Sequence, residues 1–450
     1  MLGQTKIHHI ANQVLAVSRA DETEIVIIAS TMGLTRFANN QVHQNLERKN
    51  INVNLRVVKD KKIGVASGNL NFWQEKLAKN DLKRIVDQAL LIAKSQKQDP
   101  HFVSLPGPAK YPKIVSFSKK TAAFSPADRA KKVGQVIKQA LSHQLGAFGA
   151  IQAGVNEIAV ANSAGVFAYF PETYSSLNIT MMGKGRSGYA SEVAVDIDQI
   201  KPEKVAQKSA QKATVGRKEV ELRPGKYEVI LEPPAVNQML LYLSYLGFGG
   251  RSYHEGRSFI SGKLGQKIVG DNITIWDDGL DVIGFPVPFD FEGVPKEKLS
   301  LIEKGIVKNI LYDSYLASKY GQKSTGHGLI APNTLDALAG HLRIKPGNKP
   351  ASQLISEVKR GILVSRLWYV NAHHNNLVIT GLTRDGTFLI EKGEIVAPIK
   401  DMRITQSIPK ALSKVTGISK ETKVEESWTG ANLVPVLRIS DFNFTGVSKL

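Results

Sequence analysis

The sequence contains no cysteine among its 450 residues. This absence excludes disulfide bonds and thiolate metal ligands. No apolar run approaches the roughly 20 residues that a membrane helix needs. The first ten residues, MLGQTKIHHI, also lack the basic region and apolar block of a signal peptide. We therefore expect a cytoplasmic protein with no membrane association.

Acidic residues are scarce relative to basic ones, 40 against 59, which gives a formal net charge of +19. Such an excess of positive charge can favour binding to an acidic partner or to nucleic acid, or it can keep the protein in solution. The basic residues lie in short clusters at 59–62, 129–132 and 208–218, without interleaved aromatics. No helix-turn-helix, zinc-finger or RRM pattern accompanies them. A solvated basic surface is therefore favoured, an acidic partner or peptide comes next, and specific nucleic-acid binding comes last.

The overall composition, 42% hydrophobic and 22% charged, is that of a globular protein with two or three domains. Apolar periodicity predicts an N-terminal α/β unit with a helix over 7–20, a strand over 24–30, a hairpin through 66 and a helix over 82–95. The four prolines in residues 98–112 indicate a linker after this unit.

A middle unit of helices and strands follows the linker. Ser125 and Pro126 are typical of a helix start, and the helix is expected to run to about 145. Alternating residues over 150–198 predict a strand meander, followed by a helix at 202–214. The C-terminal half is expected to be a large, mostly antiparallel sheet with helices near 235–246 and 350–360. The predicted class is α+β, with domains at 1–105, 118–220 and 224–450.

Residues 224–265 read as a strand, a helix and a glycine-rich exit that ends in Ser261, Gly262 and Gly265. This layout resembles the TldD/PmbA family, also called gyrase modulators, whose catalytic members carry HExxxH on that helix at a fixed distance before S-G-x-x-G. The resemblance extends through the segments RFANNQVHQNLERKNINVNLRVVKDKKIGVASG (36–68), FDFEGV (289–294), KSTGH (323–327) and FLIEKGEI (388–395). It therefore covers almost the whole chain.

The family's metal-ligand positions are altered in this sequence. In the register of S-G-x-x-G, the two histidine positions fall on Leu241 and Leu246, and the glutamate position falls on Tyr242, within the stretch Leu241-Tyr242-Leu243-Ser244-Tyr245-Leu246. The position of the family's third ligand, a cysteine before the last strand, corresponds to Thr429. A catalytic zinc needs about three protein ligands, and a carboxylate usually takes the proton from its bound water. Leucine supplies no lone pair.

The resemblance therefore implies the metal-free PmbA/TldE-type branch, with no catalytic residues, no metal and no cofactor. It implies a non-catalytic subunit that forms a heterodimer with a metal-bearing TldD-like subunit, or a homodimer, and that takes part in the proteolysis of unfolded peptide segments. An alternative is an autonomous metallopeptidase with a displaced metal site. A second alternative is a DNA- or gyrase-binding modulator.

A displaced metal site would have to use the remaining histidines. His254 and Glu255 begin an HExxH motif, but Ser258 and Phe259 occupy its end. His327, in the KSTGH segment, is expected to order a loop. His373 and His374 are adjacent, and on a strand they would point to opposite faces.

Asp290 and Glu292 flank Phe291 at a spacing that would place both carboxylates on one side of an extended segment. Paired acids can perform acid–base chemistry. No nucleophile accompanies this pair in the sequence, so we expect it to have a structural role or to form part of a groove wall.

Overall fold

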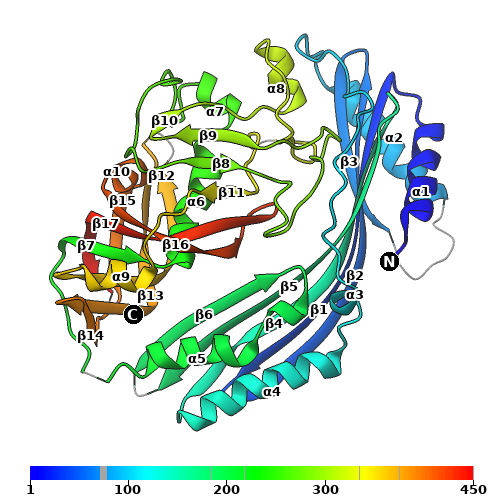
Figure 1. The fold of residues 1–450 in the computed structure, drawn as a ribbon. Coiled ribbons are helices and arrows are strands. Elements are labelled where there is room, and N and C mark those ends of the chain that lie inside the picture. Colours follow the sequence, from blue (N-terminus) through cyan, green and yellow to red (C-terminus); the bar gives the residue numbers. More distant parts are fainter. Residues whose placement is uncertain (71–78, 184, 217, 334, 374–375, 449–450) are drawn as a thin grey trace.

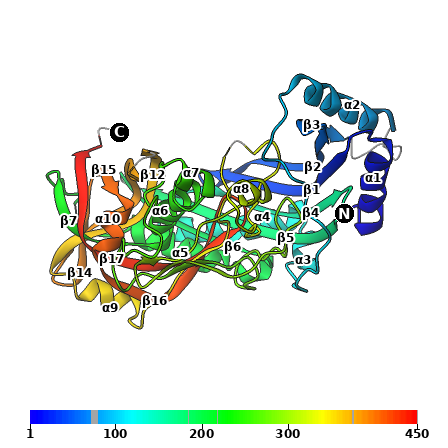
Figure 2. The same ribbon diagram turned by 90° about the horizontal axis from the view of Figure 1, so that it is seen from above.

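The computed structural model describes residues 1–70, 79–183, 185–216, 218–333, 335–373 and 376–448. A six-stranded sheet and an 11-stranded sheet form the frame. Figure 1 shows the first sheet as a long curved layer beside the C-terminal unit, and Figure 2 shows the N-terminal helices and the C-terminal unit at opposite ends. The predicted α+β class is confirmed. Among the described residues, no helix has the length and apolar character needed to cross a membrane.

The six-stranded sheet is shared by the N-terminal and central segments. The N-terminal segment supplies α1 (Gln4–Val17), β1 (Glu22–Ala38), β2 (Gln41–Lys59), β3 (Lys62–Leu70) and α2 (Lys79–Ser95). The central segment supplies α3 (Lys119–Ala122), α4 (Pro126–Ser142), β4 (Gly146–Asn162), β5 (Phe167–Gly183), β6 (Arg186–Ala194) and α5 (Pro202–Ala213). The strand order is β3-β2-β1-β4-β5-β6, so β1 and β4 join the two segments. The domain bounds 1–105, 118–220 and 224–450 stay a prediction.

Successive side chains of each strand point to opposite faces of this sheet. Ile25 and Ile27 of β1 pack in the core with α1 and α2, whereas Val26 faces the C-terminal unit. The helices α4 and α5 cover the same face as α1 and α2, through Leu177 and Ile179 of β5. The predicted start of α4 is confirmed, because Ser125 forms a capping box there.

The C-terminal unit contains the second sheet and its helices: β7 (Gly225–Leu231), α6 (Pro233–Leu246), α7 (Gly250–His254), β8 (Ile275–Asp277), β9 (Leu299–Glu303), β10 (Ile306–Val307), α8 (Ser314–Lys319), β11 (Leu342–Ile344), α9 (Ala351–Ser356), β12 (Arg360–His373), β13 (Val378–Glu391), β14 (Glu394–Pro398), β15 (Met402–Ser407), α10 (Ile408–Ser413), β16 (Val415–Glu426) and β17 (Ala431–Val447). The pairings of β7, β12, β13, β15 and β17 close into a ring. Helix α6 packs against β12 and β17.

The helix predicted over 350–360 is shorter than expected. It ends at Ser356, and β12 begins at Arg360 because the chain there pairs in parallel with β7, with Ile362 opposite Val229. At Gly361 a Cβ would lie 2.6 Å from the Glu228 carbonyl oxygen, so the chain approaches β7 closely at this point. Tertiary strand pairing therefore overrides the local helical pattern.

The inner face of the first sheet contacts the C-terminal unit through apolar and charged groups. Val287 and Phe289 pack against Val26 and neighbouring residues of β4 and β5. Beside them, the half-buried Arg56 lies 2.8 Å from the buried Glu24 and 3.4 Å from the buried Glu292 of the C-terminal unit. Buried charges of opposite sign hold each other in place because each would be costly alone. The two halves of the chain are therefore in fixed contact here.

Candidate functional site around helix α6

Helix α6 begins with two prolines after Glu232 and ends at Leu246, with Gly247 as its C-cap. Proline suits the first helical turn because that turn has no backbone partner for an N–H group. The helix is apolar on most sides, and Ala235, Met239 and Leu243 belong to the large core of the C-terminal unit. Apolar packing in the core therefore holds this helix in place, without a contribution from charged side chains on its surface.

The three α6 residues that the family resemblance assigns to metal-ligand positions have different surroundings. Leu241 is half-buried and lines a groove. The Tyr242 hydroxyl donates a hydrogen bond to the carbonyl oxygen of Val370. Leu246 is 5% exposed and belongs to the core. The same helix also donates from Ser244 Oγ to the Ala339 carbonyl oxygen at 2.5 Å, so its hydroxyl groups bind the backbone of β12 and of the segment before β11.

Thr429 lies in the short loop between β16 and β17, next to α6. In this loop Trp428 Nε1 donates to the Leu241 carbonyl oxygen at 3.3 Å, and Ser427 Oγ donates to the Gly340 carbonyl oxygen at 2.5 Å. A Cβ at Gly340 would collide with Thr429 Oγ1. A larger residue at position 340 would therefore force the Thr429 side chain to move.

A groove of ≈ 390 Å³ runs between α6 and the inner face of the first sheet. The sheet contributes Ser176 and Asn178 of β5, which point away from the helix-covered face. The opposite wall includes Leu241, Trp368 and Trp428. Trp428 is 57% exposed, so an aromatic surface is open to a ligand in this groove.

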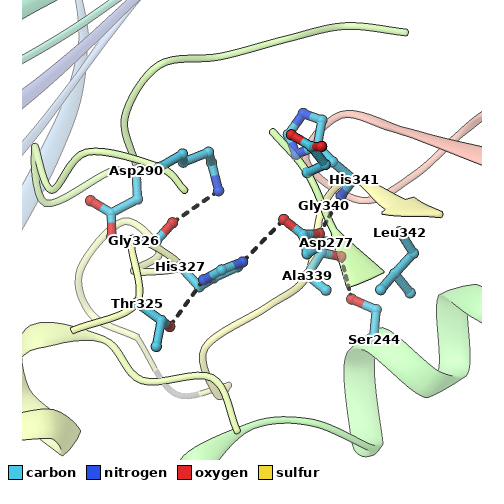
Figure 3. A network of polar contacts seen from close by, with 12 residues as sticks. Ser244, Asp277, Asp290, Thr325, Gly326, His327, Ala339, Gly340, His341 and Leu342 are labelled. Carbon is cyan, nitrogen blue, oxygen red and sulfur yellow. Dashed lines mark hydrogen bonds and ion pairs between the residues drawn. The ribbon is translucent and has the colours of Figure 1, made fainter. Parts of the chain in front are cut away.

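A buried network of polar side chains lies beneath this loop (Figure 3). Asp277, at the end of β8, has one carboxylate oxygen 3.1 Å from His327 Nε2, and its other oxygen accepts the His341 backbone N–H at 2.7 Å. His327 Nδ1 lies 3.0 Å from Thr325 Oγ1. Lys296 Nζ donates to the Gly326 carbonyl oxygen at 2.9 Å. The network ties four separate segments together.

Burial and neighbouring charges together set the protonation state of each group in this network. Burial alone would raise the pKa of Asp277, but the hydrogen bond and charge of His327, together with Lys296 and His341, hold it well below its usual range. Burial, together with Lys296, lowers the pKa of His327. Burial lowers the pKa of His341 to about 4. At neutral pH we therefore assign a charged carboxylate between two neutral imidazoles.

His341 is a structural group in this network. Its Nε2 lies 2.9 Å from the Phe285 carbonyl oxygen and therefore carries the proton, while its buried Nδ1 has no hydrogen-bond partner among the described residues. A Cβ at Gly430 would collide with this ring. The sequence interpretation missed Asp277, Lys296 and His341, because isolated polar residues give no periodic signal.

Asp290 and Glu292 lie in a turn and not in an extended segment, which corrects the expected strand geometry. Asp290 Oδ1 accepts the backbone N–H groups of Glu292 and Val294, both at 2.9 Å, and its Oδ2 accepts that of Gly328 at 2.7 Å. An Asp side chain that accepts nearby backbone N–H groups stabilises a turn. Burial and the charge of Glu292 raise the pKa of Asp290.

Two of these groups also line a small cavity. Asp290 and His327 face a space of ≈ 40 Å³, together with Thr429 and with Glu172 from the first sheet. The structure thus brings His327, Asp290 and Thr429 to one place, while Leu241 lines the separate groove on the other side of the loop.

The other predicted candidates belong to a different cluster. His254 Nε2 lies 2.9 Å from the Tyr312 hydroxyl, and its ring stacks on Tyr320 with centroids 3.6 Å apart. Glu255 forms an ion pair with Arg257 at 2.5 Å. His373 ends β12, and His374 lies outside the described residues. In the described ranges, no three His, Asp or Glu side chains come together in a way that could hold a metal ion.

The fold is shared with solved structures. TldE from Thermococcus kodakarensis superposes with a TM-score of 0.87 at 24% identity, covering 98% of this chain and 100% of that chain. At this identity the likeness concerns the fold.

The sequence matches define the family. The chain matches the PmbA/TldA metallopeptidase domain 1 over residues 23–93, the central domain over 110–217 and the C-terminal domain over 224–446. It therefore belongs to the PmbA/TldD metallopeptidase family. An uncharacterized protein of Methanocaldococcus jannaschii is 29% identical over 260 residues, 56% of this chain and 59% of that protein. The metalloprotease PmbA of Escherichia coli O157:H7 is 28% identical over 195 residues, 42% of this chain and 41% of that protein. The chain thus spans less than two thirds of the length of these relatives.

Proposed function

We propose that this chain is the non-catalytic subunit of a two-subunit metallopeptidase of the TldD/TldE type. It pairs with a metal-bearing TldD-like subunit, and the two subunits together enclose a chamber that holds the catalytic site. This chain closes one side of that chamber and helps to admit unfolded peptide segments for cleavage. The observation that carries the proposal is the chemistry of α6, where Leu241, Tyr242 and Leu246 stand at the positions of the family's two histidines and glutamate. Two of these side chains cannot bind a cation, and the Tyr242 hydroxyl is engaged with a backbone carbonyl.

The position of the third ligand supports the same conclusion. The Thr429 side chain is packed against Gly340, and it faces a cavity of only ≈ 40 Å³. A hydroxyl is a poor substitute for a thiolate in zinc binding. The three positions therefore lack the donors that a catalytic zinc requires, and the catalytic centre of the complex is assigned to the partner subunit.

The groove along α6 supports a role in handling peptides. It combines an aromatic wall with polar groups of β5, such as the exposed Asn178. Aromatic surfaces bind apolar side chains, and polar groups accept backbone hydrogen bonds without strong sequence preference. An unfolded segment passing toward a catalytic site would find both kinds of contact here.

The test is co-purification with a TldD-like protein from the same organism, followed by mass measurement of the eluted species. We expect a heterodimer that cleaves an unfolded protein, whereas this chain alone does not cleave it. Elemental mass spectrometry should find no zinc in this chain and about one zinc in the complex. A stable monomer that ignores the TldD-like protein would contradict the proposal.

A second measurement distinguishes the proposed non-catalytic subunit from the alternative, an autonomous metallopeptidase with a displaced metal site. If this chain alone carries about one zinc and cleaves peptides in a chelator-sensitive way, His254→Ala should abolish that cleavage. The matched control is His143→Ala, which removes an exposed histidine from the end of α4. Loss of cleavage in the first variant and not in the second would establish an autonomous enzyme and overturn the proposed function.

A further inference from the structure

A second groove, of ≈ 870 Å³, lies between α5 and the C-terminal unit. Its first wall carries a row of lysines on α5 and at its N-cap, namely Lys201, Lys204, Lys208 and Lys212. Its opposite wall comes from residues 421–423 of β16 and from Ile355 of α9. Figure 1 shows α5 beside β6, the last strand of the first sheet. This groove is separate from the ligand positions on α6.

The lysine row has an excess of positive charge. Spacings of three and four residues place these side chains on one face of the helix, where like charges repel. Lys212 forms an ion pair with Glu232 at 2.5 Å. Lys201, Lys204 and Lys208 are exposed and form no ion pair among the described residues. Lys120 and, through its charge, Lys201 lower the pKa of Asp198, so the uncompensated charge of the row lies mainly on Lys204 and Lys208.

The acidic residues of the groove do not balance this row. Glu232 is engaged by Lys212, and Glu421 accepts the Ala351 backbone N–H at 3.1 Å. Glu192 is the remaining carboxylate among the lining residues. An incoming anionic group would therefore meet Lys204 and Lys208, neither of which forms an ion pair among the described residues, with Lys201 beside them near Asp198.

The base of the groove is apolar. Leu363, Phe388 and Val436 form part of a buried cluster there, and Ile355 packs against it. Ile395, which also lines the groove, is 41% exposed. A ligand that carried only charge would leave this surface uncovered, whereas a ligand with both acidic and apolar side chains would match the lysine row and the base together.

These observations favour a polypeptide over a nucleic acid. Single-stranded nucleic acids bind by stacking bases on open aromatic rings. The aromatic lining residues here are Phe388, which is 2% exposed, and Tyr189, whose ring is covered by the Arg366 guanidinium at 4.1 Å. Residues 189–192 of β6 also line the groove, and among the described strands β6 has a neighbour on one side only. Such a strand edge offers backbone groups that an extended peptide can pair with.

We propose that the groove between α5 and the C-terminal unit binds acidic polypeptide segments with interspersed apolar residues. The site shares Tyr189, Ser191 and Pro234 with the α6 groove but none of the ligand positions on α6, and it stands whether or not the chain pairs with a catalytic subunit. It also gives the positive charge of this chain a local role, since Lys204 and Lys208 face one binding surface.

The test measures fluorescence anisotropy of labelled peptides of about 12 residues, a length that spans a groove of this kind, with the full-length chain. An alternating Glu–Val peptide should bind, and Lys–Val and Gln–Val peptides should not. The double variant Lys204→Gln/Lys208→Gln should weaken binding about tenfold, because each lysine contributes roughly a factor of three. The matched control Lys131→Gln/Lys138→Gln removes the same charge from exposed positions of α4 and should change affinity less than about twofold.

A second variant tests the apolar base. Ile395→Ser should weaken binding of the Glu–Val peptide about threefold and leave a Glu–Ser peptide unaffected. Equal losses in the α4 and α5 double variants would show that only net charge matters, and would overturn the proposal. An oligonucleotide that displaces the peptide at lower concentration, and whose own binding is lost in Lys204→Gln/Lys208→Gln, would assign the groove to nucleic acid instead.

Discussion

Replacing His341 by glutamine should make the stability of the C-terminal unit less sensitive to acid. The ring is buried beside Asp277, which favours its protonation, and near Lys296 and Arg343, which oppose it. Burial is the largest influence and lowers the pKa of His341 from 6.5 to about 4. Between these values the unfolded chain holds a proton that the folded chain does not, so stability falls as pH falls through this window.

The size of the effect follows from this pKa difference. The full difference corresponds to about 3 kcal/mol, and the part lost between pH 7.5 and pH 5.0 is about 2 kcal/mol. The variant His341→Gln keeps an N–H donor for the Phe285 carbonyl oxygen and has no proton to gain. Its stability should therefore fall by about 2 kcal/mol less than that of the unchanged protein over the same range.

The assay is equilibrium unfolding by urea at the two pH values, followed by tryptophan fluorescence. Trp276 on β8 pairs with Arg343 on the strand that follows His341, so it reports on the unfolding of this region. His143→Gln controls for the loss of an imidazole at the exposed end of α4. If His341→Gln and the unchanged protein lose the same free energy between the two pH values, the assigned protonation of this ring is wrong.

Three further changes test other parts of the molecule. Arg56→Met should lower the free energy of unfolding by about 3–5 kcal/mol, because two buried glutamates lose their cation; an unchanged melting temperature in calorimetry would contradict the burial of this cluster. Burial raises the pKa of Asp401 to about 6, so its charged form costs stability as pH rises through that value. Asp401→Asn should therefore stabilise the protein by about 1–2 kcal/mol at pH 8 and have little effect at pH 4, measured by urea unfolding. Gly430→Ala should destabilise by about 2 kcal/mol because the new Cβ collides with His341, whereas Gly134→Ala on α4, with no atom within 4 Å of its Cβ, should not destabilise; equal thermal shifts would refute the close packing of the 430 loop.

The sequence predicts those parts of the structure that local rules determine. The start of α4 follows from the hydrogen-bonding of Ser125 and the fixed geometry of Pro126, and the helix over α6 follows from its apolar residues between Glu232 and Gly247. The assignment of the family's ligand positions to Leu241, Tyr242 and Leu246 rests on the number of residues before Ser261, and it stays a prediction.

Long-range pairings could not be read in this way. Alternation predicts strands at β1 and β4, but it contains no information about which strands pair. The contact between Asp277 and His327 joins residues 50 positions apart, and each residue alone resembles an ordinary loop polar group. The segment at Asp290 forms a turn where the sequence predicts an extended segment. Acidic residues two positions apart are compatible with a strand, and equally with a turn in which the Asp side chain accepts N–H groups of the residues that follow it.

The antiparallel pairing of β1 with β4 has a consequence for how the chain can be divided. The connection from 96 to 118 lies on the inner face of this sheet, where Tyr111 and Ile114 pack against β1, β4 and β5. If the chain were divided within this connection and the two parts were made separately, each would hold a three-stranded half-sheet with a bare central edge 14 residue pairs long. Unprotected edges of this length associate readily. The two fragments should therefore be insoluble when made separately and should reassemble when made together, which makes this connection a natural split point for a complementation reporter.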